Sequence, residues 1–170
     1  MQYMSLSTVE RDTLLAALED MPQYLERELL ALSDQLMRQQ GPGGAFSPVE
    51  QVWHLADLER EGFGCRIERL LSECEPQLPD FDGAAVAAAR SYQSRSLAEG
   101  VAAFRDARQA NLASLRQVAA DAWTRSGQQA GVGRVSLCDM PSFMSQHDAA
   151  HRAEIAQWKA LIAASHTAVD

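Results

Sequence analysis

Apolar residues recur at helical spacing along most of the 170-residue chain. One clear example is the stripe Leu25, Leu29, Leu32 and Leu36, whose members lie three or four positions apart. An amphipathic α-helix buries such a stripe, whereas a half-buried strand needs apolar and polar residues in alternation. No run of this sequence shows the alternation of a strand. The periodicity therefore predicts an all-α fold.

Turn and capping residues divide this pattern into helices. The clearest start is at Ser47, Pro48 and Glu50, which place an N-cap serine, a proline at the first helical position and a glutamate at the third. Pro22 predicts a break or restart within the first helix. Three glycines predict a flexible connection over residues 127–133. The expected long helices cover residues 8–39, 48–73, 97–122 and a last segment from 136 or 139 to 164, with a short extra helix over 84–92.

Four long helices with short connections predict a four-helix bundle. In such bundles, cofactor sites are commonly built from inward side chains on facing helices. A chain of this length can bury a core as one unit, so residues 1–170 are expected to form a single domain, with the short extra helix in the connection between the second and third long helices.

Composition restricts the compartment and the partners. The three cysteines have no C-x-x-C spacing, which is typical of free thiols in a reducing compartment. The sequence has no signal-peptide pattern and no run of about 20 apolar residues. We therefore expect a cytoplasmic protein that does not enter a membrane. A formal net charge of −8 disfavours nucleic acid as a partner, because phosphate binding depends on an excess of Lys and Arg. A small-molecule substrate is the expected partner.

Two histidines lie on the inward stripe of the last predicted helix. This stripe includes Met144, Ile155 and Trp158, and a rotation of about 100° per residue places His147 and His151 within it. Residues four apart have Cβ atoms roughly 5–6 Å apart, so two imidazoles can converge on one metal ion. The alternative is that both are hydrogen-bonded core residues, which is the commoner role of a buried histidine.

His54 lies on the second long helix, but not on its main apolar stripe. A helical wheel places His54 roughly 140° from the centre of that stripe, on a second and narrower stripe with Leu58 and Cys65. A helix with two such stripes is expected to be covered on two sides, by the bundle and by a partner subunit. Periodicity alone leaves open whether His54 meets the other two histidines.

Several short segments resemble the DinB-like superfamily. Their order and spacing carry the resemblance, which extends over nearly the whole chain. The segments are residues 53–59 (WHLADLE), 66–71 (RIERLL), 76–79 (PQLP), 123–127 (WTRSG), 133–136 (GRVS) and 147–151 (HDAAH).

The resemblance implies a bundle that is often a homodimer and holds one divalent metal ion on three histidines. By position these ligands are His54, His147 and His151, all of which are present. The family includes transferases and isomerases that use low-molecular-weight thiols, as well as metal-dependent hydrolases. Three imidazoles leave a coordination position open for water, thiolate or substrate, and they suit zinc, nickel or iron.

Three further residues are candidates around the metal site. Glu154 follows His151 by one helical turn and is expected to accept a hydrogen bond from an imidazole or to act as a general base. Its alternative is a salt bridge to the inward-facing Arg108. Arg108 and Asn111 are expected to orient an anionic substrate, with a carboxylate pair as the alternative role of Arg108.

Two functions therefore remain open at the level of sequence. The first is a metal-dependent enzyme, either a thiol-dependent transferase or a hydrolase. The second is a non-catalytic metal-binding bundle that acts as a binding or stress-response module. A third possibility is that the histidines only pack in the core.

Overall fold

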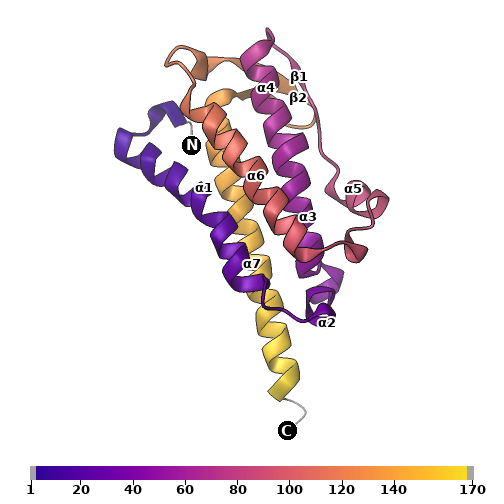
Figure 1. Cartoon of the computed structure of the whole chain (residues 1–170). Helices are drawn as coiled ribbons and strands as arrows, with labels where there is room; N and C mark the ends of the chain where they lie inside the picture. Colours follow the sequence, from indigo (N-terminus) through magenta and orange to yellow (C-terminus); the bar gives the residue numbers. More distant parts are fainter. Residues whose placement is uncertain (1–2, 168–170) are drawn as a thin grey trace.

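The computed structural model describes residues 3–167, and its frame is the expected bundle of four long helical segments (Figure 1). These are α1 (Thr8–Leu29), α3 (Pro48–Asp57) with its continuation through a π-helical segment (Leu58–Gly64) into α4 (Cys65–Ser72), α6 (Leu97–Arg116), and α7 (Met140–Thr167). The shorter elements are α2 (Asp34–Met37), α5 (Gly83–Ala89) and 3₁₀ turns at Tyr3–Ser5, Pro42–Gly44, Tyr92–Ser94, Ala122–Thr124 and Leu137–Asp139.

Capping residues fix where the helices begin. The Ser47 N–H donates to Oε2 of Glu50 at 2.9 Å, and Pro48 is the first residue of α3, which confirms the helix start predicted from the sequence. Ser136 and Asp139 make the same kind of contact at 2.9 Å, but a 3₁₀ turn follows them. The last α-helix therefore begins at Met140.

The predicted break at Pro22 is wrong, because α1 continues through this residue to Leu29. A proline inside a helix leaves the carbonyl group four residues earlier without its N–H donor. Here that carbonyl belongs to Leu18, and it accepts a 2.9 Å hydrogen bond from Nη1 of Arg108. A side chain from α6 thus replaces the missing backbone donor. The helix ends at Leu29 instead of near residue 39, and the short α2 follows.

The flexible connection predicted over residues 127–133 is also wrong, because this region forms part of a small sheet. Strands β2 (Ser126–Gln129) and β3 (Gly133–Ser136) pair antiparallel, with Gly127 opposite Val135. Strand β1 (Gln77–Leu78) pairs parallel with β2. The strands are too short to show an alternating pattern, and the glycines in this region favoured a loop over strands. Gly131 and Gly133 have φ angles of 75° and 97°, which suits the turn between β2 and β3.

The connection between α4 and α6 returns along the outer side of α3, where Figure 1 shows α5. Ion pairs and a hydrogen bond hold it there. Arg90 binds Glu61 through Nη1 at 3.0 Å and Nη2 at 2.8 Å, and the hydroxyl group of Tyr92 donates to Asp57 at 2.6 Å. This connection therefore covers a face of α3 that the four long helices leave open.

Buried apolar side chains form two clusters along the bundle. The first includes Leu18, Ile67, Leu115, Val135 and Met144, and it lies next to the small sheet. The second includes Leu25, Val52, Trp53, Phe104 and Ile155. On α7, His147 and His151 fall between Met144 of the first cluster and Ile155 of the second. The polar centre of the molecule thus lies between two apolar cores.

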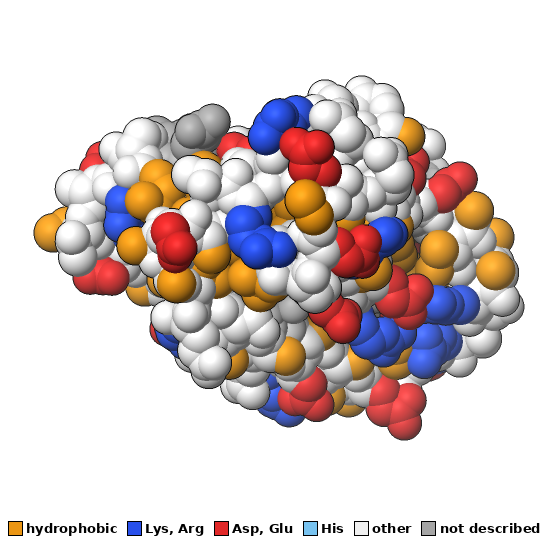
Figure 2. Space-filling view, turned by 90° about the horizontal axis from the view of Figure 1, so that it is seen from above, with side chains coloured by type: hydrophobic (Ala, Val, Ile, Leu, Met, Phe, Trp, Pro, Cys, Tyr) orange, Lys and Arg blue, Asp and Glu red, His pale blue; other side chains and the backbone are white. Residues whose placement is uncertain are grey.

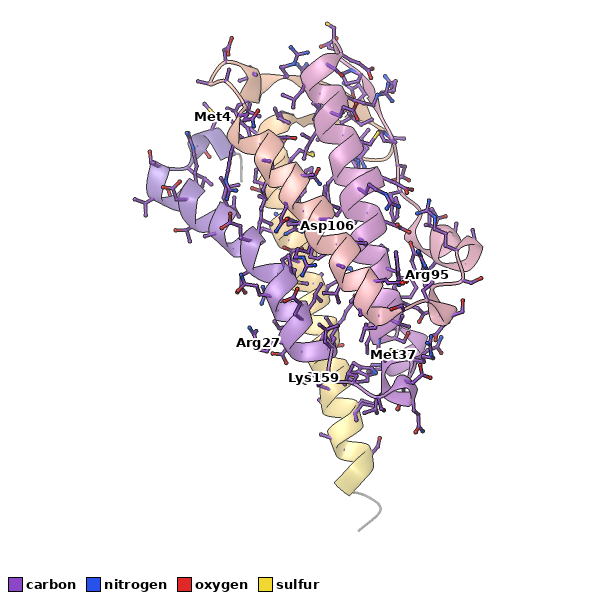
Figure 3. The ribbon with its side chains drawn as sticks, viewed as in Figure 1. Met4, Arg27, Met37, Arg95, Asp106 and Lys159 are labelled. Carbon is purple, nitrogen blue, oxygen red and sulfur yellow. The ribbon has the colours of Figure 1, made fainter. Side chains whose placement is uncertain are left out.

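Near the C-terminal end of α1, charged residues join this helix to α7. Arg27 and Lys159 lie at the same level in Figure 3, and Glu28 pairs with both. Beyond this point the last turns of α7 project from the bundle (Figure 1). Within residues 3–167, no helix combines the length and the apolar character needed to cross a membrane.

Candidate metal centre

Three imidazole rings from two helices meet inside the bundle. His54 comes from α3, and His147 and His151 lie one turn apart on α7. Nε2 of His147 is 3.3 Å from Nε2 of His54 and 3.1 Å from Nε2 of His151. Two nitrogens bound tetrahedrally to one zinc ion at about 2.0–2.1 Å would be about 3.3–3.4 Å apart. The observed separations are therefore close to those of ligands on a shared ion.

Burial favours the neutral form of His54 and His147. It lowers the pKa of His54 to about 4 and that of His147 to about 3, and the neighbouring His151 adds to both shifts. His151 itself is 5% exposed. A neutral imidazole offers a lone pair to a metal, whereas a protonated ring offers none. Figure 2 is consistent with this burial. On the face that it shows, acidic and basic side chains are interspersed and no histidine is visible.

Hydrogen bonds fix the tautomer of His151. Its Nδ1 contacts Oε1 of Gln51 and lies 3.2 Å from Oε2 of Glu154. The amide nitrogen of Gln51 donates to the same Glu154 oxygen at 2.7 Å, which sets the orientation of the amide group. Both neighbours of Nδ1 are therefore acceptors, so Nδ1 must carry the ring proton. The lone pair is then on Nε2, the atom that faces the other two histidines.

His54 is placed by residues of its own chain. Its ring lies 5.6 Å from the ring of Phe46 and 5.9 Å from that of Phe81. Gly83 lies against it so closely that a Cβ atom there would be 2.5 Å from Cε1 of His54 and 2.6 Å from Nδ1. Nδ1 is buried and has no hydrogen-bond partner among the described residues. Glycine at position 83 therefore makes room for the imidazole.

At His54, the second stripe of the second helix is covered by other parts of the same chain. Around His54 the covering residues are Phe46, Phe81 and Gly83, which belong to the connections before α3 and after α4. A partner subunit is not needed to explain this burial. The burial of His54 consequently carries no argument for dimerisation.

Arg108 and Asn111 form a separate buried network beside the π-helical segment. Arg108 is 1% exposed, and its Nη atoms donate to Asp148 at 2.7 and 2.8 Å and to Glu59 at 2.9 Å. Asn111 donates to the carbonyl and carboxylate oxygens of Glu59 at 2.8 and 2.9 Å. These contacts match the alternative in which Arg108 pairs with a carboxylate. The alternative given for Glu154, a salt bridge to Arg108, is not formed, since Glu154 contacts Gln51 and His151 instead.

Sequence reasoning missed three residues of this region. Gln51 precedes His54 by three positions and so shares its side of the helix, which was an available signal. Glu59 and Gly83 gave none, because their roles depend on contacts with α6 and with the ring of His54.

The donor set fits a divalent cation. Three imidazole nitrogens within 4.8 Å of one another are a common ligand set for zinc and related ions. Without a cation, the short contact between Nε2 of His151 and Nε2 of His147 would require one of the two to be a donor. Because His151 already carries its proton on Nδ1, that donor would have to be His147.

Comparisons with known proteins agree with this architecture. The model of the DinB superfamily matches residues 17–155. YfiT from Bacillus subtilis, described as a probable metal-dependent hydrolase with an unusual four-helix bundle topology, superposes with a TM-score of 0.85 at 18% identity. The match covers 93% of this chain and 90% of YfiT.

A second structure, a mycothiol-dependent maleylpyruvate isomerase, matches with a TM-score of 0.70 at 10% identity, over 91% of this chain and 63% of that protein. No curated protein sequence matches the chain. Both structural matches are below 25% identity and show the fold alone. The family model spans most of the chain, in agreement with the bundle and the three histidines. This chain is therefore a member of the DinB superfamily.

Proposed function

We propose that this chain is a metal-dependent enzyme that acts on a small molecule, and that its reaction is a hydrolysis. The observation that carries the proposal is the convergence of three Nε2 atoms, one of them held as an acceptor by Gln51 and Glu154. Three protein ligands with a further position left open are typical of catalytic zinc sites, whereas structural sites are closed by four protein ligands. We expect zinc, nickel or iron, all of which accept imidazole ligands.

A divalent ion bound here would supply Lewis acidity, which makes a water or thiol more nucleophilic near neutral pH. The other tasks belong to the chain. His54, His147 and His151 would hold the ion, and the apolar clusters on either side would limit the access of water. Gln51 and Glu154 would orient His151 through its Nδ1–H group.

The contacts of Glu154 favour a positioning role over a general base. Its Oε2 atom accepts from Gln51 and faces His151, and the hydrogen bond to His151 keeps the pKa of this carboxyl group well below its usual range. A Glu154→Gln variant should therefore lower metal affinity more than it changes turnover of the fully loaded protein. Equal affinity in the variant and the parent would contradict this role.

Thiol-dependent transfer is the alternative reaction. It would use the same histidines, with a low-molecular-weight thiol in place of water as the nucleophile. The fold shared with the mycothiol-dependent isomerase supports it, although this chain spans 63% of that protein. We propose hydrolysis before thiol transfer because YfiT, described as a probable metal-dependent hydrolase, matches this chain over nearly its full length. A homodimer in the cytoplasm remains our expectation, and sedimentation velocity of the purified chain would measure the oligomeric state.

Elemental analysis tests the metal centre directly. The parent chain should retain about one equivalent of metal per chain after dialysis, as a single three-histidine site requires. His54→Ala and His147→Ala should both lose it. His166→Ala is the matched control, because His166 lies in the same helix, 15 residues beyond His151. Absence of metal from the parent, or full retention in both variants, would refute the site.

Turnover assays then distinguish an enzyme from a non-catalytic metal-binding module. The loaded chain is assayed with a panel of carboxylic esters and amides, and separately with thiols and electrophilic acceptors. Activity on the first panel that disappears in His147→Ala and persists in His166→Ala supports hydrolysis. Activity confined to the second panel supports thiol transfer. Full metal occupancy without turnover on either panel favours the binding module.

A further inference from the structure

A cleft of about 490 Å³ opens beside His147. Its walls are mostly apolar and include Leu58, Phe63 and Phe143, and the loop between β2 and β3 forms its rim through Val132. A larger hollow, about 680 Å³ between the second helical segment and α6, is lined by none of the three histidines. Of these two, only the cleft beside His147 is lined by a residue of the metal centre.

One cation lies in this apolar wall. Arg66 is 6% exposed, and its Nε donates to the carbonyl oxygen of Pro79 at 3.0 Å. Its guanidinium group lies 5.8 Å from the centre of the Phe63 ring, whose own centre is 6.0 Å from that of His147. A continuous set of contacts thus leads from the cation to the metal centre.

Arg66 has no counter-ion within salt-bridge distance in the part of the chain that the structure describes. The exposed carboxylate of Asp80 acts on it without forming an ion pair, and burial lowers the pKa of the guanidinium group. By contrast, Arg108, the other deeply buried arginine among the described residues, is held by two carboxylates. Buried charges are normally paired, because loss of hydration is costly. An unpaired cation that lines an open cleft is thus suited to an anionic ligand.

We propose that this cleft binds the substrate and that Arg66 recognises a single carboxylate group on an otherwise apolar molecule. The planar guanidinium group can bind both oxygens of a carboxylate through two N–H groups. The apolar body would pack against Phe63, Phe143 and Leu58, with its reacting group toward His147. A single cation in apolar walls suits a monoanion better than a phosphate dianion. This inference rests on the proposed function for its reaction, but its binding site can be tested separately.

The test measures binding of 4-(trifluoromethyl)phenylacetate and of its uncharged primary amide to the zinc-loaded chain by fluorine NMR. The carboxylate should bind about tenfold more tightly or better, as expected for a hydrogen bond to a charged group. Arg66→Met should abolish this preference, and Arg66→Lys should retain part of it. Arg69→Met is the matched control, because Arg69 lies one turn further on α4 and pairs with Glu73 outside the cleft.

One further variant and one further ligand separate binding through Arg66 from other modes of binding. Phe143→Ala should weaken both probes by similar factors and leave the preference for the carboxylate unchanged. A preference that survives in zinc-loaded Arg66→Met would mean that the carboxylate binds the metal, and would overturn the proposal. Tighter binding of phenyl phosphate than of the carboxylate would also overturn it. If turnover is absent but the Arg66-dependent preference is present, the proposed function fails and the binding site stands.

Discussion

Arg108 donates a 2.9 Å hydrogen bond to the carbonyl oxygen of Leu18, the group that Pro22 leaves without its helical donor. The same guanidinium group binds Asp148, the neighbour of His147 on α7, and Glu59 in the π-helical segment. One buried side chain therefore joins α1, α6, α7 and the second helical segment. A π-helical segment often marks a functional region, and here it brings Glu59 to Arg108 beside the metal centre.

Replacing Arg108 with Met should strongly destabilise the fold. The change leaves Glu59 and Asp148 buried without a counter-ion, and removal of one partner from a buried ion pair costs about 3–5 kcal/mol. Urea unfolding followed by circular dichroism would measure the free energy of unfolding. Arg105→Met is the control, because Arg105 lies on the same helix in an exposed pair with Glu26 and should cost less than about 1 kcal/mol. Equal losses in the two variants would contradict the role given to the buried network.

Replacing Gln51 with Met should weaken metal binding while the fold is retained. The methionine fills a similar volume but cannot accept the Nδ1–H of His151 or donate to Glu154. Loss of such an outer hydrogen-bond partner typically lowers metal affinity by about 10–100-fold. Competition with a zinc chelator measures the affinity. Gln109→Met, at an exposed position of α6, should leave it unchanged. A zinc affinity equal to that of the parent would show that Gln51 does not orient the ligand.

Replacing Gly83 with Ala should also weaken metal binding, although alanine is the better helix former. The added methyl group would be 2.5 Å from Cε1 of His54, so the imidazole must shift from its present position relative to the other two rings. Helix propensity alone would predict a gain of up to about 1 kcal/mol in stability with no effect on zinc. Zinc competition and urea unfolding together separate these outcomes. The exposed Ala84→Ser change in the same helix serves as the control.

The bundle could be predicted from the sequence because its long helices carry strong periodic patterns and clear caps. Ser47 and Glu50 fixed a boundary by local chemistry alone. The failures occurred where a distant residue replaced a local interaction. Pro22 is tolerated only because Arg108 reaches Leu18 across the bundle, and strand β2 is held partly by β1, about fifty residues earlier. No local pattern could indicate either contact.

The candidate site was predictable to a different extent for each ligand. His147 and His151 could be assigned to one face of a helix from their spacing, and the structure places them together. His54 could be assigned only through the family resemblance. Helical phase is not constant along its segment, because the π-helical turn at Leu58–Gly64 shifts the residues that follow. A single helical wheel over residues 48–73 therefore combines two different faces, because His54 lies before the shift and half of the apolar stripe lies after it.

Replacing Glu61 with Gln should reduce stability at neutral pH but not at strongly acidic pH. The hydrogen bond to Arg90 lowers the pKa of Glu61 below its value of 4.5 in an unfolded chain. The ionised form therefore stabilises the fold above about pH 4.5, and this contribution is lost as the pH falls through the lowered pKa. Glu61 is partly exposed, so we expect a difference below about 1 kcal/mol at pH 7. Urea unfolding of parent and variant at several pH values measures this difference in the free energy of unfolding. Glu68→Gln is the control, because Glu68 is exposed and has no salt bridge among the described residues. If the difference persisted below the lowered pKa, the contribution of Glu61 would not depend on its charge.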